Sequence, residues 1–304
     1  MRDFDQSNIT RAVIESFQQT PDARLKRIMT SLADHLHRFV SEVGLTPEEW
    51  SYSIEFLTRT GQMCSEKRQE FILLSDTLGV SMLVDALSHG ALEGATDSTV
   101  LGPFFSKDSP SLPNGADISR GLLGEPLFVD GRVTSVDGAP IIGAKVEVWQ
   151  SDADGYYDVQ RADFDEAALR ATFTTAADGC FNFWSIMPRY YPIPDDGPVG
   201  DMLKATGRHP NRPAHIHFKI DGRGFETLVT HIFDAESPYL DSDAVFGVKN
   251  SLVAKFEREY AGVGPFGKSV SKPWRKLSYE FGLKAQFIDA RSVQKTNADA
   301  TSCY

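Results

Sequence analysis

The chain has 304 residues, of which 41% are hydrophobic and 24% charged, and its formal net charge is −11. This composition is typical of a globular protein, and the acidic balance argues against nucleic acid as a partner, because phosphate binding needs a basic surface. No window approaches the roughly 20 apolar residues of a membrane span, so we expect no membrane-embedded segment. The start of the chain lacks the pattern of a signal peptide and the three cysteines are scattered, which favours a cytoplasmic location.

Helical periodicity dominates the first hundred residues. Apolar residues form one stripe between Asp22 and Gly44, and a glycine is well suited to end that helix. A second helix is predicted to begin at Thr46, with a proline at its first position and Glu49 completing a capping box. A third long segment, from about Ser65 to Leu87, is apolar on more than one side. We therefore expect it to be buried or to lie at a subunit contact.

Prolines and glycines become frequent between residues 101 and 126, which indicates a loop-rich passage. We place a domain boundary there, between a helical N-terminal domain at 1–104 and a catalytic domain at 105–289. The remaining residues, 290–304, are polar and are expected to form a frayed tail.

Short alternating runs with turn signals between them follow Pro126, which predicts a β-sandwich. The runs cover 128–136, 144–149, 170–175, 181–186, 215–220, 228–233 and 248–256. An Asp-Gly turn at 178–179 is typical of a β-hairpin. Two long irregular segments, 151–168 and 188–213, interrupt the strands, and such loops frequently carry function. The predicted fold class is thus mostly β, with a helical N-terminal domain.

His215 and His217 lie two residues apart in one of these runs. Side chains alternate along a strand, so both imidazoles point to the same face and form half of a metal site. Two readings compete with a catalytic metal. In the first, each histidine is satisfied by a neighbouring hydrogen-bond partner; in the second, the pair belongs to a structural zinc site in a binding module.

Each irregular segment carries a Tyr-Tyr pair, at 156–157 and at 190–191. Tyrosines of this kind are ordinarily core aromatics with a hydroxyl at the rim. Carboxylates beside them, within 152–158 and at 195–196, fit a cation site or tight turns, and we favour turns.

Taken together, the runs VEVWQSDADGYYDVQ, MPRYYPIPDDGPVGDML and GRHPNRPAHIHF resemble the intradiol ring-cleaving dioxygenases, which open catechols between their two hydroxyls. The resemblance extends over about 73–255. It implies one Fe(III) per chain, held by two tyrosines and two histidines, and catalytic roles for an arginine and for the second tyrosine. The implied ligands are Tyr157, Tyr191, His215 and His217, and the implied catalytic groups are Arg212 and Tyr191.

Two further stretches, LVTHIF at 228–233 and LDSDAVFGVKNSL at 240–252, resemble the members of the family that cleave hydroxyquinol. This implies cleavage of hydroxyquinol with O2 to maleylacetate in aromatic catabolism. The alternative is a catechol or substituted catechol as substrate, giving a cis,cis-muconate. The implied substrate pocket consists of Leu73, Asp76, Val100, Leu101, Gly102, Pro103, Ile193, Pro194, Arg212 and Val245.

Within that pocket Asp76 suits a third ring hydroxyl, because a carboxylate can accept a hydrogen bond that an apolar side chain cannot. An aspartate on a helix surface is the other reading of this residue. By the resemblance, His231 occupies a position at which catechol-cleaving members of the family tend to have glutamine. It is a weaker candidate for a residue that contacts the metal ligands.

None of the implied ligands lies in the helical N-terminal domain. In the relatives that it resembles, this domain forms a dimer contact with a hydrophobic channel at the interface that can hold a lipid. The resemblance therefore implies a homodimer with a phospholipid at its interface.

Overall fold

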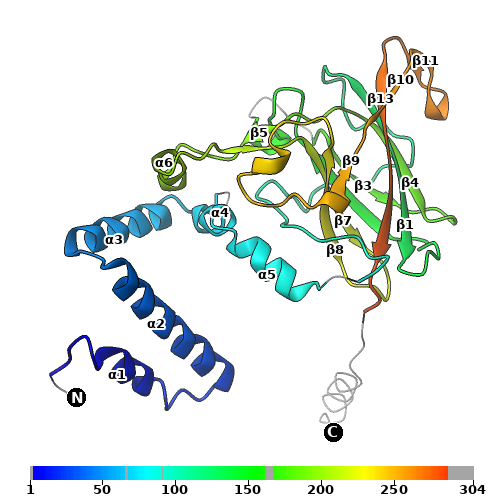
Figure 1. The fold of residues 1–304 in the computed structure, drawn as a ribbon. Coiled ribbons are helices and arrows are strands. Elements are labelled where there is room, and N and C mark those ends of the chain that lie inside the picture. The colour runs from blue at the N-terminus through cyan, green and yellow to red at the C-terminus, as the bar shows by residue number, and fades with distance from the viewer. Residues whose placement is uncertain (1–2, 66–67, 91, 162–166, 287–304) are drawn as a thin grey trace, which may run out of the picture. The chain divides into compact units, whose positions relative to one another are not determined.

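The computed structural model describes residues 3–65, 68–90, 92–161 and 167–286 (Figure 1). The chain forms two compact units, which divide between Gln62 and Met63, and each is described by itself. The predicted tail at 290–304 lies outside the described residues.

Three helices make up the first unit: α1 (Ile9–Ser16), α2 (Ala23–Val43) and α3 (Pro47–Gln62). The predicted ends of α2 and the start of α3 are confirmed. Gly44 ends α2 in the left-handed conformation, with φ of 63°. Thr46 and Glu49 form the reciprocal capping box, in which the Thr46 N–H donates to Glu49 Oε2 over 2.9 Å and the Glu49 N–H to Thr46 Oγ1 over 3.3 Å.

The predicted long segment at 65–87 contains two helices, α4 (Glu70–Thr77) and α5 (Val80–Ser88), separated by Gly79 at φ 73°. They are bent by 76°. In this single chain the segment is buried only in part, because Leu73 and Met82 are buried whereas Leu78, Leu83 and Leu87 are exposed, and the subunit contact stays a prediction. No single helix in the described ranges is long and apolar enough to cross a membrane, whereas the bent α4–α5 pair passes that test by length and composition alone.

Two sheets form the centre of the second unit. One has the strand order β10–β13–β1–β4, and the other β3–β2–β7–β8–β9. Their bounds are β1 (Pro126–Ser135), β2 (Lys145–Gln150), β3 (Arg170–Thr174), β4 (Cys180–Ile186), β7 (His215–Asp221), β8 (Leu228–Asp234), β9 (Val253–Ala254), β10 (Glu257–Glu259) and β13 (Trp274–Leu283).

Smaller elements connect these strands. They are β5 (Tyr191–Pro192) paired with β6 (Asn211–Arg212), β11 (Gly262–Val263) paired with β12 (Ser269–Val270), α6 (Pro198–Ala205), and the 3-10 turns η1 (Asp158–Gln160), η2 (Leu240–Ser242), η3 (Asn250–Leu252) and η4 (Pro265–Gly267). The second irregular segment, 188–213, therefore contains a helix and two short strands.

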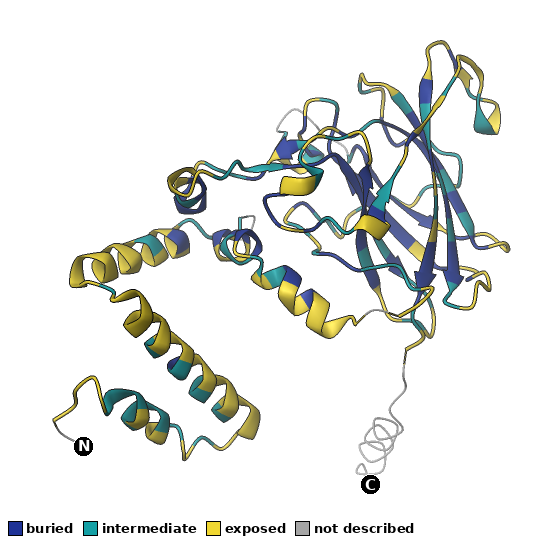
Figure 2. Cartoon of the chain, viewed as in Figure 1, coloured by how far each residue is buried: buried dark blue, intermediate teal, exposed yellow. Residues whose placement is uncertain are grey.

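The predicted β-sandwich is confirmed by the packing between the sheets. Phe173 of β3 stacks on Phe183 of β4, with ring centroids 5.1 Å apart, and Phe181 of β4 meets Phe218 of β7 edge to face. Buried residues run along the facing strands (Figure 2). Because the inner faces of both sheets are closed by aliphatic and aromatic side chains, the strands that carry the histidines are held rigidly.

The hairpin predicted at Asp178-Gly179 is wrong. The chain does turn there, with Gly179 at φ 80°, but β3 pairs with β2 in one sheet and β4 pairs with β1 in the other. The turn therefore crosses from sheet to sheet. The predicted strand at 248–256 is also largely wrong, because only Val253–Ala254 joins a sheet there and η3 precedes it.

Candidate metal centre

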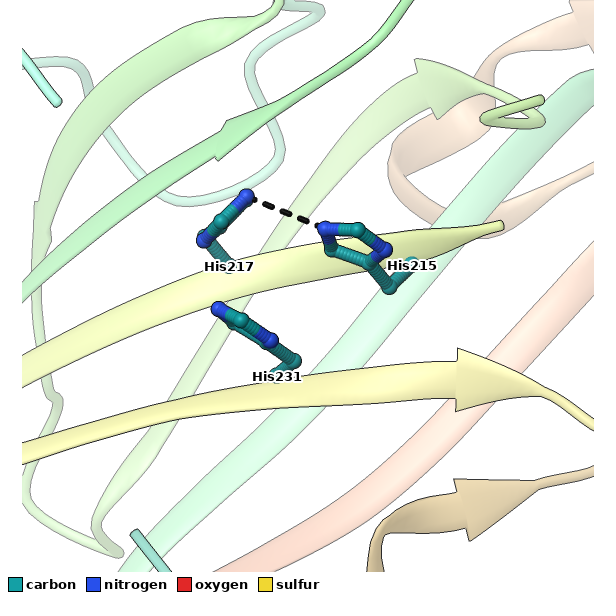
Figure 3. Close-up of side chains that lie close together, drawn as sticks. All are labelled: His215, His217 and His231. Carbon is teal, nitrogen blue, oxygen red and sulfur yellow. Dashed lines mark hydrogen bonds between the residues drawn. The ribbon is translucent and has the colours of Figure 1, made fainter. Parts of the chain in front are cut away.

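Two histidines project from β7, which lies between β2 and β8 in the five-stranded sheet. His215 and His217 are both buried, and their Nε2 atoms are 3.1 Å apart (Figure 3). Nδ1 of His215 lies 2.7 Å from the Pro213 carbonyl oxygen, which assigns the ring proton to Nδ1. The lone pair on His215 Nε2 is thereby left facing His217.

The two tyrosine-bearing segments bring two phenols to the same point. The Tyr157 hydroxyl is 2.9 Å from His217 Nε2 and 3.4 Å from the Tyr191 hydroxyl. Both rings are buried, whereas Tyr156, the neighbour in the first pair, is 53% exposed. Tyr191 is held in β5 by its pairing with Arg212 of β6. The structure thus brings the four predicted ligands together.

These four side chains fit a metal ion. Burial raises the pKa of Tyr157 well above its usual value and lowers the pKa of His215 to about 3, so without a cation the phenol is protonated and the imidazole is neutral. A bound cation reverses that balance for the phenol, since it stabilises the phenolate. Phenolate oxygen and imidazole nitrogen suit iron, and no thiolate that would favour zinc is among them.

His231 is the third histidine of this cluster. It stands opposite His217 on β8, its ring is stacked on His215 with centroids 4.7 Å apart, and the ligand atoms of the three histidines lie within 4.8 Å of one another (Figure 3). Burial, together with His215 and Arg212, keeps the pKa of His231 well below its usual value. A neutral ring here can accept a hydrogen bond, and Arg212 Nη2 lies 3.4 Å from its Nδ1.

Arg212 lies beside the ligand cluster and is almost fully buried. Its Nη1 is 3.5 Å from His215 Nε2, and its Nε donates to Asp243 Oδ1 over 3.0 Å. A buried guanidinium next to two phenols can stabilise negative charge that develops at the site.

Three of the predicted pocket residues meet in one apolar cluster. Leu73 of α4, Ile193 and Val245 are buried together, and Asp76 lies on the same helix as Leu73. Gly102 lies close to the imidazole of His217, because a Cβ there would come within 3.2 Å of His217 Cε1. Val100 and Pro194 are half-buried, and Leu101 and Pro103 are exposed.

Sequence reasoning missed three residues around the site. Trp149 of β2 stacks on His217, with ring centroids 4.6 Å apart, and Phe104 stacks on Tyr157 at 4.4 Å. Asp243 pairs with Arg212. Trp149 and Asp243 lie inside the motif stretches, but from the sequence a tryptophan there suggests only a core aromatic residue, and an aspartate only a turn residue. Only the three-dimensional contacts separate them from their neighbours.

Comparison with known proteins shows which family this fold and site define. A family model described as "Dioxygenase" matches residues 100–285, and one described as "Catechol dioxygenase N terminus" matches residues 22–96. The chain belongs to the intradiol ring-cleaving dioxygenases, as its sequence resemblance predicts, and is therefore an aromatic ring-cleaving enzyme. Membership of this family implies a non-haem iron.

Similar proteins include the 6-chlorohydroxyquinol 1,2-dioxygenase of Cupriavidus pinatubonensis, which is 55% identical over 86% of this chain and 95% of the relative. The hydroxyquinol 1,2-dioxygenase of Nocardioides simplex is 49% identical over 91% of this chain and 95% of its own. Among solved structures, hydroxyquinol 1,2-dioxygenase from Pseudomonas putida DLL-E4 superposes with a TM-score of 0.87 and 48% identity, covering 92% of this chain and 99% of that one.

Proposed function

We propose that the protein is a hydroxyquinol 1,2-dioxygenase, which cleaves 1,2,4-trihydroxybenzene with O2 between adjacent hydroxyls to give maleylacetate. Both oxygen atoms enter the product, so the reaction needs no other reductant. The high identity to relatives named hydroxyquinol 1,2-dioxygenase supports the proposal. The observation that carries it is the burial of the Asp76 carboxylate beside the apolar cluster of Leu73, Ile193 and Val245, which belong to the predicted substrate pocket.

Asp76 lies on α4 next to the cluster of Leu73, Ile193 and Val245, and only 6% of it is exposed. Burial raises its pKa, and a hydrogen bond with Ser81 and the charge of Arg212 act in the opposite direction. Its Oδ1 has no hydrogen-bond partner among the described residues. A buried, unpaired carboxylate oxygen costs free energy unless a ligand satisfies it, and a third ring hydroxyl is a donor of the right kind.

We propose that Tyr157, Tyr191, His215 and His217 hold one Fe(III) per chain. Two phenolates offset much of the charge of a ferric ion, which favours that oxidation state over the ferrous one. When bound, the ion supplies Lewis acidity and one-electron redox capacity toward the adjacent hydroxyls of the substrate. Two phenols and two imidazoles favour a ferric site over the alternative of a structural zinc site in a non-catalytic module.

Two side chains act on the substrate in this proposal. Tyr191 Oη, as a phenolate, would accept a proton from one of the adjacent hydroxyls as the diol binds, because it lies in the ligand cluster. The Arg212 guanidinium stabilises negative charge on the ring as it reacts with O2. Trp149, Phe104 and the buried ligand rings exclude water from this point.

The substrate is tested by comparing wild type and Asp76→Ala on hydroxyquinol and on catechol. For wild type we expect a clear preference for hydroxyquinol. For Asp76→Ala we expect kcat/KM for hydroxyquinol to fall by about 10- to 100-fold, the value of a hydrogen bond to a charged group, while kcat/KM for catechol holds or rises.

Asp76→Asn is the matched control, since it keeps an acceptor oxygen in the same volume and should retain part of the preference. A wild-type preference for catechol would show that the alternative, a catechol 1,2-dioxygenase, is correct. Equal losses on both substrates in Asp76→Ala would show that Asp76 acts through the fold and not through the third hydroxyl.

We also propose that the protein is a cytoplasmic homodimer with a phospholipid at its interface. Supporting this, the apolar stripe of α2 stays about half exposed in the single chain, as do several leucines and valines of α5. Exposed apolar faces of this extent are typical of contact surfaces.

A further inference from the structure

The guanidinium of Arg212 is held by a single carboxylate that comes from another part of the chain. Asp243 follows η2, 31 residues after Arg212, and accepts Arg212 Nε on Oδ1 over 3.0 Å and Arg212 Nη2 on Oδ2 over 3.2 Å. Only 3% of the arginine side chain and 2% of the aspartate side chain are exposed. Two parallel bonds of this kind fix both the position and the plane of the guanidinium.

This pairing decides which nitrogen of the arginine faces the site. Nε and Nη2 are both taken by Asp243, and Nη2 also lies near His231 Nδ1, at 3.4 Å. Nη1 is left beside the ligand cluster, 3.5 Å from His215 Nε2. A donor held at one place, aimed at charge that develops during the reaction, needs no reorganisation at that moment.

Asp243 is itself held by its own loop. The backbone N–H of Gly247 donates to Oδ2 over 2.9 Å, and the N–H of Val245 lies 3.4 Å from Oδ1. Gly247 has to be small, because a Cβ there would lie 2.9 Å from Arg212 Nη2. The segment 243–247 thus carries both the anchor of the arginine and Val245, a member of the apolar cluster in the proposed substrate pocket.

We infer that Asp243 is a positioning residue of the ring-cleavage reaction. Its two hydrogen bonds to Arg212 direct Nη1 of that arginine toward the ligand cluster. Because Asp243 belongs to the segment 243–247, the position of the guanidinium also depends on the loop that carries Val245. The inference depends on the dioxygenase activity but not on which diol is the substrate. Without Asp243 the plane of the Arg212 guanidinium is not fixed, and the buried charge of Arg212 is left to pair with substrate or with Tyr191.

The test is steady-state kinetics of Asp243→Asn, with whichever diol the wild type turns over faster. We expect kcat to fall by about 10- to 100-fold, as is usual when a partner that orients a catalytic group is lost, and KM to change by less than about 3-fold. Iron content and the visible spectrum should match wild type, since no ligand is altered. Asp241→Asn, an exposed aspartate two residues away, is the matched control and should keep full kcat.

A double variant separates positioning from structure. If Asp243 acts through Arg212, adding Asp243→Asn to Arg212→Lys should lower kcat little beyond Arg212→Lys alone. Full kcat in Asp243→Asn, or losses that multiply in the double variant, would overturn the inference. Should Asp243→Asn fail to fold, Gly247→Ala decides: it keeps Asp243 but presses a methyl on Nη2, and unchanged kcat there would overturn the inference as well.

Discussion

Replacing Tyr157 by phenylalanine is expected to remove most of the bound iron and the visible colour, and to lower kcat by about 100-fold or more. The physical reason is that the Tyr157 hydroxyl lies between His217 Nε2, at 2.9 Å, and the Tyr191 hydroxyl, at 3.4 Å, so it is the donor that joins the histidine and tyrosine halves of the cluster. Without it one phenolate alone opposes the charge of a ferric ion. Iron per chain and absorbance between the near ultraviolet and the red measure the effect.

Tyr156→Phe is the matched control, because Tyr156 is the neighbouring tyrosine and points to solvent with 53% of its surface exposed. It should keep iron, colour and turnover. Retention of iron and colour by Tyr157→Phe, or their loss from Tyr156→Phe, would show that the ligand assignment within the pair is wrong.

The second large effect is expected for Arg212→Lys, which should lower kcat by about 100-fold or more while the iron and its spectrum stay in place. One ammonium cannot occupy both the two positions paired with Asp243 and the Nη1 position beside His215. Loss of a donor aimed at developing charge costs about 100- to 1,000-fold in kcat. The remaining positive charge keeps Asp243 from becoming an unpaired buried carboxylate, so folding should survive.

Steady-state kinetics and a metal assay on the same preparation measure this effect. Arg189→Lys serves as the control, since this arginine lies in the Tyr-Tyr segment but is exposed. An Arg212→Lys variant with wild-type kcat would exclude a role for the guanidinium in the reaction.

Much of the fold could be predicted from local sequence because the signals are themselves local. Alternation marks the strands that have one face in the core, and Asp22, Gly44 and the Thr46–Glu49 pair fix helix ends through bonds within a few residues. The predictions that were wrong concern features that depend on partners far away in the sequence. Whether Asp178-Gly179 makes a hairpin is decided by β1 and β2, which pair with β4 and β3 from elsewhere in the chain.

The break between α4 and α5 was missed for a related reason. Gly79 interrupts an otherwise continuous apolar run, and a single glycine is compatible with a helix interior. A Cβ built at Gly79 would come within 3.5 Å of Phe246 Cδ2, so the loop that carries Asp243 lies beside the bend. The helix before the bend, α4, carries Leu73 and Asp76, which are residues of the proposed substrate pocket.

For the site, the motif stretches led to Tyr157, Tyr191, His215 and His217 by resemblance, and the structure gathers all four. Their role as iron ligands stays a prediction. The two-residue spacing of the histidines is readable from strand geometry alone, whereas the choice of Tyr157 over Tyr156 comes from the resemblance, and the burial of Tyr157 beside an exposed Tyr156 agrees with it. Asp243 could not be found at all, because its meaning comes from Arg212, which lies on a different element.

The most direct test of the ligand set is the colour and metal content of the purified wild-type protein. Phenolate-to-ferric charge transfer should colour a concentrated solution red-brown, with one iron per chain, and hydroxyquinol added without oxygen should shift the band as the diol binds. A colourless protein that contains zinc, or an absorption band that does not shift when hydroxyquinol is added, would contradict the proposed iron site.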